Sequence, residues 1–471
     1  MGLTETALAS LMAVAGREPV RNVEIEAGAP GLATRFAADE CAAAAIAAGA
    51  VIAGDLWALR GGRTQTVRVS TREAAAGLIG FSLQRFGDPE RAPPMAYGHA
   101  GKAANGFMPT RDGRHIYLHP SFPASTQTLL KVLGCADDRA TVLATVGARD
   151  ALELETAIAE AGACAAMVRT PEEWDASHQG RTMAGRPVVE VIKIGDSAPE
   201  PLPSGGDRPL SGIRALDLTR VLAGPTCGRT LAQYGADVML VSSPNLPFVA
   251  PFVSDTSTGK LSAFLDLATA DGRGRLRDLV RGADVFTQGY RVGALERAGF
   301  GAVELAALRP GLVYTSLNCY GHEGPWRSRP GWEQLAQTAT GMALMHGTPG
   351  HPELQPGAVT DYTTGFLAAF GVMIALYRRA LWGGSYRVRV SLAQTGMWIR
   401  AVGVAGPERL AQVVPFTGDE LQGWMLTTES GFGPMSHLRP PVRMDATPTR
   451  WARPSTPLGS HPPAWPDMAA A

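Results

Sequence analysis

The stretch GIRALDLTRVLAGPTCGRTLAQYGADVMLV, at residues 212–241, decides the fold class. Its apolar runs and its glycines predict, in order, a buried strand, a turn, a helix and a second strand, at residues 212–218, 219–225, 227–234 and 237–241. This order makes a βαβ unit, so a parallel sheet is expected. The same pattern continues with a helix and two further strands, at residues 276–283, 284–287 and 312–317. We therefore predict an α/β fold with a doubly wound parallel sheet.

The size and the charge balance of the chain limit the classes of partner. With 471 residues, the chain is long enough for about two to three domains and a large core. Lys plus Arg and Asp plus Glu number 43 each, so the formal net charge is zero. A neutral chain has no general electrostatic footprint for nucleic acid or an anionic membrane. We expect neither as a partner.

Cysteine usage and the N-terminal residues bear on the compartment. No two of the five cysteines have a CxxC or similar spacing, which favours a reducing compartment and argues against a structural zinc site. Residues 1–20 lack the basic start and the continuous apolar run of a signal peptide. No segment reaches the ~18 uninterrupted apolar residues of a membrane span. The sequence thus predicts a cytoplasmic protein without metal or membrane segments.

An internal repeat divides the chain. DECAAAAIAAGAVIAGDLWALRGGRTQTVRVS (residues 39–70) aligns with DYTTGFLAAFGVMIALYRRALWGGSYRVRVS (residues 361–391), with Asp39 opposite Asp361. A glycine pair and a VRVS strand recur in both copies, with one residue inserted between them. Each copy predicts a helix, a glycine turn and a strand, and we interpret the pair as a duplication.

Between the copies lie a small α+β module and a linker rich in proline, glycine and serine. The module is predicted from a strand at 112–120 and helices at 126–133 and 150–161. From Thr427 onward the tail is loop-rich and expected to be partly disordered. The predicted division is a partial first copy, the small domain, the linker, a large α/β domain and a C-terminal extension, at residues 1–95, 96–195, 196–209, 210–404 and 405–471.

Several blocks in this order resemble the class III CoA-transferases, the superfamily of carnitine and formyl-CoA transferases and α-methylacyl-CoA racemase. The blocks are LSGIRALDLTRVLAGPTCGRTLAQYGADVMLV, GKLSAFLDL, ADVFTQGYRVGALERAGFG, SLNCYGHEGPWRSRPGWEQLAQTATG and the second copy of the repeat, over residues 210–404. DGRHIYLHPSFPAS and AGACAAMVRTPEEW are similar to the family's small domain. The chain then resembles the back part of one copy followed by the front part of another. The resemblance implies a Rossmann-like large domain with a smaller α+β domain, and interlocked chains in a homodimer.

The resemblance places the family's aspartate nucleophile at Asp361. A carboxylate has a reference pKa of about 3.9 and needs no base at neutral pH to attack an acyl-CoA thioester. The implied sequence is an aspartyl mixed anhydride, an enzyme thioester, and transfer of coenzyme A to an incoming carboxylic acid. Without the resemblance, a plain helix N-cap is the favoured interpretation of Asp361. Asp39 has no front half before it and is predicted to be a relic or an N-cap.

Three cations are candidate contacts for the phosphates of CoA. Arg220 follows the first strand of the large domain, where phosphates bind in such sheets. Lys260 and Arg291 match basic positions of the family's blocks, although Val292 replaces a proline after Arg291. Each cation suits a phosphate and is also compatible with a solvated surface charge.

Several residues differ from the family's patterns, and these differences bear on the alternative functions. Residues 242–244 (SSP) and the missing GxGxxG argue against a nicotinamide or flavin dinucleotide. Leu222 replaces a glutamine of the formyl-CoA transferase branch, which argues against oxalate or formate. Trp332 and Glu333 replace a racemase His-Asp pair, so racemisation needs His322 or His346 as a substitute. The leading hypothesis is an acyl-CoA:carboxylate CoA-transferase. A racemase or epimerase and a non-catalytic CoA-binding subunit remain as alternatives.

Overall fold

The computed structural model describes residues 2–18, 22–94 and 102–466. A seven-stranded sheet lies at the centre of the large domain, in the order β10-β9-β8-β11-β12-β13-β7. Six strands are parallel: β8 (Arg214–Leu218), β9 (Asp237–Ser242), β10 (Lys260–Phe264), β11 (Val285–Gln288), β12 (Val313–Asn318) and β13 (Ser385–Ser391). Numbered from β8, this is the 3-2-1-4-5-6 order of a doubly wound sheet. The predicted fold class is confirmed.

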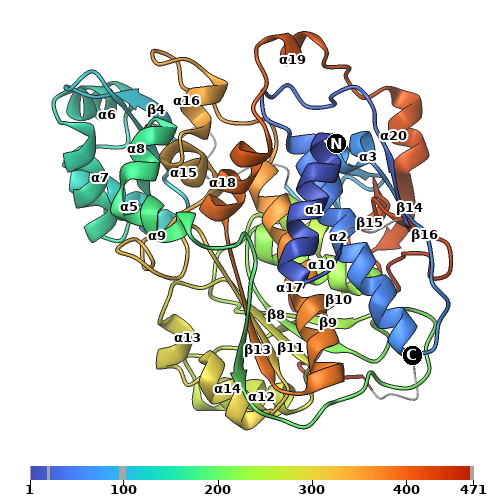
Figure 1. Cartoon of the computed structure of the whole chain (residues 1–471). Helices are drawn as coiled ribbons and strands as arrows, with labels where there is room; N and C mark the ends of the chain where they lie inside the picture. The colour runs from blue at the N-terminus through green and yellow to red at the C-terminus, as the bar shows by residue number, and fades with distance from the viewer. Residues whose placement is uncertain (1, 19–21, 95–101, 467–471) are drawn as a thin grey trace.

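Helices cover both faces of this sheet (Figure 1). Successive side chains of a strand point to opposite faces, so Val285 packs toward α10 and α17 and Phe286 packs toward α12 and α14. The helices are α10 (Ala223–Gln233), α11 (Ala250–Thr256), α12 (Ala270–Arg281), α13 (Ala294–Arg297), α14 (Ala302–Leu308), α15 (Glu333–Ala339), α16 (Met342–His346) and α17 (Val359–Trp382). The unbroken apolar runs read from the sequence are explained by burial on both faces.

The small domain has a core of its own. Its sheet has the antiparallel order β4-β5-β6, formed by Gly106–Pro109, His115–Leu118 and Ala165–Met167. Its helices are α5 (Pro123–Leu133), α6 (Arg139–Gly147), α7 (Ala151–Glu160), α8 (Pro171–Ala176) and α9 (His178–Ala184). The predicted small domain extends to residue 195. This boundary is wrong, because β7 (Glu190–Gly195) pairs antiparallel with β13 and belongs to the large sheet. The proposed boundary at residues 95–96 lies outside the described residues.

The two repeat copies have the same order of elements. β1 (Val23–Glu26), α2 (Ala38–Leu59), β2 (Val67–Ser70) and α3 (Thr71–Gly77) correspond to β12, α17, β13 and α18 (Leu392–Val402). β2 lies between parallel β1 and antiparallel β16 (Arg443–Met444), as β13 lies between parallel β12 and antiparallel β7. This shared topology supports the interpretation of the pattern as a duplication.

Within the described residues, α2 and α17 have the length and the apolar composition of membrane spans. They lie side by side in the core (Figure 1), with Gly49 of α2 facing the Met373 side chain of α17. A Cβ atom at Gly49 would lie 3.3 Å from Met373 Cε, so the Met373 side chain packs closely against the α2 backbone there. Burial inside the fold accounts for their composition as that of core helices.

The linker is fixed by the end of α2. The Arg60 guanidinium donates hydrogen bonds to the carbonyl oxygens of Pro203 and Gly205, both at 2.7 Å, and of Pro209 at 2.9 Å. Near the end of α17, Gly384 N–H donates to Ser197 Oγ at 2.8 Å. The segment between the copies therefore lies against the glycine turns of both.

The C-terminal extension is folded. It contains α19 (Glu408–Ala411), α20 (Gly418–Trp424), β14 (Met425–Ser430) and β15 (Gly433–Leu438), and β15 pairs with β3 (Arg85–Phe86). His461 then covers the edge of the large sheet, because its N–H donates to the Ser262 carbonyl and its Nδ1 accepts from the Ser262 N–H. The expectation of a partly disordered tail is wrong for residues 427–466, and residues 467–471 lie outside the described part. The remaining helices are α1 (Leu3–Ala15) and α4 (Gly80–Leu83).

Candidate functional site

Two of the predicted cations lie at the point where the strand order of the sheet reverses. Arg220 follows β8, and Arg291 follows β11, the strand that pairs with β8 on the other side of this point. In open α/β sheets, ligands bind in the crevice outside the carboxyl ends of the strands at such a switch point. The topology therefore gives Arg220 and Arg291 the location that a phosphate contact requires.

A small pocket opens beside Arg220. Its lining includes Phe122 of the small domain, the carboxyl end of β9 and residues of α11. The Arg220 guanidinium lies 4.9 Å from the centre of the Phe122 ring and donates a hydrogen bond to the Pro247 carbonyl. Val221 follows with φ +70°, a conformation that is costly for a β-branched residue and is found mainly at constrained functional turns. The first turn after β8 is therefore held in a specific shape.

Arg291 also reaches the small domain. Its Nη2 donates to the Gly162 carbonyl at 2.9 Å, while the side chain as a whole stays exposed. Both cations thus lie where the two domains meet, and Arg291 keeps further N–H donors for a ligand.

The structure places Lys260 elsewhere. Its side chain is fully buried, and Nζ donates to Asp217 Oδ2 and to the Pro225 carbonyl, both at 2.7 Å. This ammonium neutralises a buried carboxylate of β8 and has no open path to a ligand. Lys260 does not fit the predicted phosphate contact, so it is corrected to a structural ion pair.

Asp361 lies in the first turn of α17 and is partly buried. Among the described residues, no group donates a hydrogen bond to its carboxylate. Burial raises the pKa of Asp361 from 3.8 to about 7, because the charged form loses hydration that nothing replaces. The helix N-terminus favours the anion, but burial outweighs this effect. A carboxylate with no hydrogen-bond partner keeps its lone pairs free for attack on an electrophile.

Glu333 lies beside the turn that carries Asp361, a proximity that was not predicted from the sequence. Its Oε1 accepts hydrogen bonds from Thr360 N–H at 2.7 Å and from Gln337 Nε2 at 2.9 Å. Burial, and then the negative charge of Asp361, raise the pKa of Glu333 well above its ordinary value. Two carboxyl groups this close do not ionise independently. The long separation of the two residues in sequence gave no signal of this pairing.

Aromatic side chains connect the pocket with the turn that carries Asp361. The Phe122 ring lies between the Arg220 guanidinium and the Trp332 ring, whose centre is 5.6 Å from that of Phe122. Trp332 also stacks on His119, with 4.7 Å between ring centres, and is followed by Glu333. Phe122 and His119 of the small domain thus line one side of the site, and Trp332 is part of the same aromatic wall.

Neither histidine offered as a racemase substitute has the properties of a free acid or base. Burial lowers the pKa of His322 to about 3, and its Nε2 hydrogen-bonds Ser316 Oγ at 2.8 Å. Burial also lowers the pKa of His346. These observations do not favour racemisation.

The site equivalent to Asp361 in the first copy is closed. Asp39 is 2% exposed, its Oδ2 accepts from Gly31 N–H at 2.7 Å, and burial raises its pKa to about 6. The C-terminal extension covers this turn. Arg409 Nη1 and Nη2 donate to the two Glu40 carboxylate oxygens, each at 2.9 Å, and the Phe416 ring packs on Gly31. This enclosure supports the interpretation of Asp39 as a relic.

Comparisons with known proteins identify a family and several relatives. The model of CoA-transferase family III matches residues 2–198 and 210–424. An acetyl-coenzyme A transferase of Hypoxylon pulicicidum is 34% identical over 319 residues, 62% of this chain and 54% of its own length. An acyl-CoA transferase of Gibberella moniliformis is 38% identical over 261 residues, 52% of this chain and 46% of its own length. The crystal structure of Rv3272 from Mycobacterium tuberculosis is 32% identical, with a TM-score of 0.40, over 42% of this chain and 58% of that chain.

The chain spans about half the length of the curated relatives that it matches. The family model, in contrast, matches two segments that together make up most of the chain. The chain belongs to CoA-transferase family III.

Proposed function

We propose that this protein transfers coenzyme A between an acyl-CoA and a carboxylic acid, with Asp361 as the covalent nucleophile. The observation that carries the proposal is the unpaired Asp361 carboxylate in the first turn of α17. The aromatic wall that leads from this turn to the switch point with Arg220 supports it. Membership of CoA-transferase family III favours the same chemistry.

The proposed reaction needs only acyl transfers. An Asp361 oxygen attacks the thioester carbonyl carbon, the C–S bond breaks, and the CoA thiolate leaves a mixed anhydride behind. The thiolate then attacks Asp361 Cγ, which forms an enzyme thioester and releases the first acid as a carboxylate. The incoming carboxylate attacks this thioester at Cγ and expels the thiolate, giving a second anhydride. Attack of the thiolate on the new acyl carbon yields the product acyl-CoA and restores Asp361.

Trapping of the intermediates tests the proposal. The protein is incubated with a panel of acyl-CoAs and then with hydroxylamine, and mass spectrometry locates the modified residue. We expect a hydroxamate on Asp361, absent from Asp361→Ala, together with exchange of labelled CoA into the acyl-CoA pool. Deuterium wash-in at the α-carbon without a hydroxamate would support a racemase instead. CoA binding without either activity would leave a non-catalytic subunit.

Arg220 and Arg291 are proposed to hold phosphates of CoA. A charge-assisted hydrogen bond contributes about 1.5–3 kcal/mol, so Arg291→Gln is expected to raise the dissociation constant of CoA roughly tenfold or more. Binding of pantetheine, which has no phosphates, should not change. Calorimetric titration measures both, and Arg297→Gln, an exposed cation of α13, is the matched control. An equal loss of CoA and pantetheine affinity would contradict a phosphate contact. The same comparison applies to Arg220→Gln.

A further inference from the structure

The position of the Asp361 carboxylate is set by its neighbours, since no described group holds it directly. Three contacts anchor the first turn of α17. Ala358 N–H donates to the Leu78 carbonyl at 3.0 Å, and Thr360 N–H donates to Glu333 at 2.7 Å. The third contact is made by Tyr362, the residue that follows Asp361.

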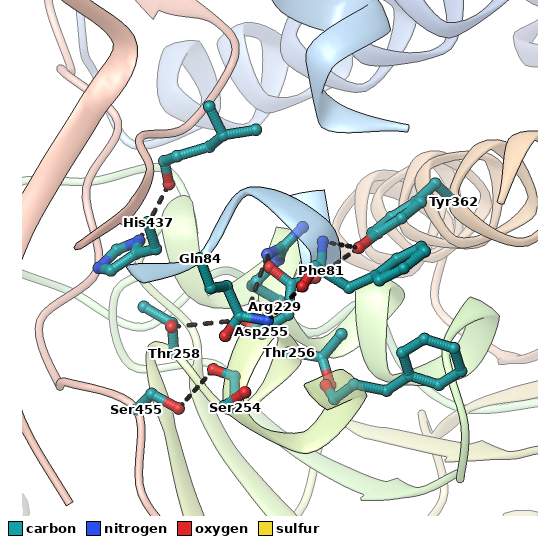
Figure 2. A network of polar contacts seen from close by, with 12 residues as sticks. Phe81, Gln84, Arg229, Ser254, Asp255, Thr256, Thr258, Tyr362, His437 and Ser455 are labelled. Carbon is teal, nitrogen blue, oxygen red and sulfur yellow. Dashed lines mark hydrogen bonds and ion pairs between the residues drawn. The ribbon is translucent and has the colours of Figure 1, made fainter. Parts of the chain in front are cut away.

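Tyr362 belongs to a buried polar network around Asp255 (Figure 2). Its side chain is fully buried, and Oη donates a 2.6 Å hydrogen bond to Asp255 Oδ2 while it accepts one of 3.0 Å from Phe81 N–H. Asp255 Oδ1 accepts from Arg229 Nη1 at 2.6 Å. Burial and the charge of Asp255 raise the pKa of Tyr362 well above its ordinary value, so the phenol stays a donor. Both hydrogen-bonding capacities of Oη are therefore used.

This network joins three distant parts of the chain. Phe81 lies in α4, near the end of the partial first copy at residues 1–95, whereas Arg229 and Asp255 lie in α10 and α11 of the large domain. The C-terminal extension adds Trp451, whose ring lies 5.7 Å from the Arg229 guanidinium and whose Nε1 donates to the Arg229 carbonyl. Arg229 is thus held on two sides, which fixes its ion pair with Asp255.

The helix α11 contacts both the pocket and the nucleophile's turn. Val253 and Thr256 line the pocket beside Arg220. Asp255, the residue before Thr256, points away from the pocket lining and binds Tyr362. Since residues adjacent on a helix project about 100° apart, the same turn of α11 serves both sites.

We propose that Asp255 and Tyr362 are positioning residues for the nucleophile, because they fix the turn that carries Asp361 against α11, the helix that also forms part of the pocket wall. This inference rests on the proposed function of Asp361. It assigns the first repeat copy a role in the active site, because Phe81 N–H and the Leu78 carbonyl complete the anchors. Neither residue contacts the reacting atoms, so their effect is expected on the rate of Asp361 acylation and not on CoA affinity.

The substitution Tyr362→Phe tests this inference, because it keeps the ring and removes the phenol oxygen. We expect the single-turnover rate of Asp361 acylation to fall by about 10- to 100-fold, the range expected for a misplacement of about 1 Å. The dissociation constant of a non-reactive CoA thioether should stay within about twofold, a margin far below the loss expected for a lost charge contact. Tyr314→Phe is the matched control, since Tyr314 is also buried and its Oη also donates one hydrogen bond, to the Phe300 carbonyl at 3.2 Å on the other face of the sheet.

The outcomes separate this inference from the proposed function. Equal acylation rates for Tyr362→Phe and Tyr314→Phe would overturn the positioning role while the adduct of the parent protein still formed. An absent adduct in the parent protein would overturn the proposed function itself. If Tyr362→Phe does not fold, Asp255→Asn decides, because the amide still accepts from Tyr362 but no longer pairs with Arg229 as an anion. A slower acylation at unchanged thioether affinity supports the inference, and an unchanged acylation rate overturns it.

Discussion

Replacing Asp361 with Asn is expected to abolish CoA transfer and, at the same time, to make the protein more stable at neutral and alkaline pH. Loss of a covalent nucleophile lowers kcat by at least about 10⁴-fold in enzymes of this kind. The stability gain follows from burial, which raises the pKa of Asp361 to about 7. The charged Asp361 carboxylate is therefore expected to destabilise the folded state.

The sign of the pH dependence follows from proton uptake. Between the unfolded pKa of 3.8 and the folded pKa of about 7, the folded protein holds a proton that the unfolded chain has released. The free energy of unfolding consequently falls as pH rises through this window. Asp361→Asn should exceed the parent protein by about 2–4 kcal/mol at pH 8 and by little at pH 4. Urea unfolding at both pH values measures the difference.

Asp39→Asn provides the matched control for this prediction. Asp39 occupies the same place in α2, and burial raises its pKa to about 6. We expect a stability gain of the same sign that is complete at a lower pH, with no loss of CoA transfer. A loss of activity in Asp39→Asn equal to that in Asp361→Asn would contradict the assignment of a single nucleophile. Unchanged stability in both variants would contradict the burial of their charges.

The sequence was sufficient to predict the structural features that depend on the local pattern of residues. Apolar runs bounded by glycine turns predicted β8, β9 and β12 to within about two residues. A strand of a parallel sheet is buried on both faces, so its sequence is a short and nearly continuous apolar run. The repeat predicted that two similar helices would occur, and they pack on each other as α2 and α17. Arg220 was predicted from its position after a strand and Arg291 from the resemblance to the family's block, and the topology brings the two together at the switch point.

The features that were missed depend on contacts between distant residues. Glu333 and the Asp361 turn meet only because α15 packs beside the start of α17. The tail was expected to be partly disordered because it is rich in proline, yet it is fixed by contacts such as Trp465 Nε1 to the Leu279 carbonyl at 2.9 Å. Composition reports local stiffness and polarity, but it cannot report which surface a segment will cover.

Lys260 leads to the second large prediction, because its motif and its structure disagree. The motif favours a phosphate contact, whereas the structure shows a fully buried pair with Asp217 at 2.7 Å. Removing one member of a buried ion pair leaves an uncompensated charge and costs about 3–5 kcal/mol. Lys260→Met is therefore expected to lose about this much unfolding free energy in urea, with little change in CoA affinity for the folded fraction.

The double variant Lys260→Met/Asp217→Asn separates the two interpretations. The amide introduced by Asp217→Asn would be uncharged and would still accept the hydrogen bond that Thr219 N–H donates to Asp217 Oδ1 at 3.1 Å. Most of the lost stability should then return, since the penalty arises from the charge left behind and not from the missing methylenes. A phosphate contact predicts the opposite pattern, in which CoA affinity falls about tenfold at nearly unchanged stability and Asp217→Asn restores nothing. The two patterns differ in both measured quantities. Urea unfolding and CoA titration of the parent protein and the two variants therefore decide whether Lys260 acts as a core ion-pair partner or as a phosphate contact.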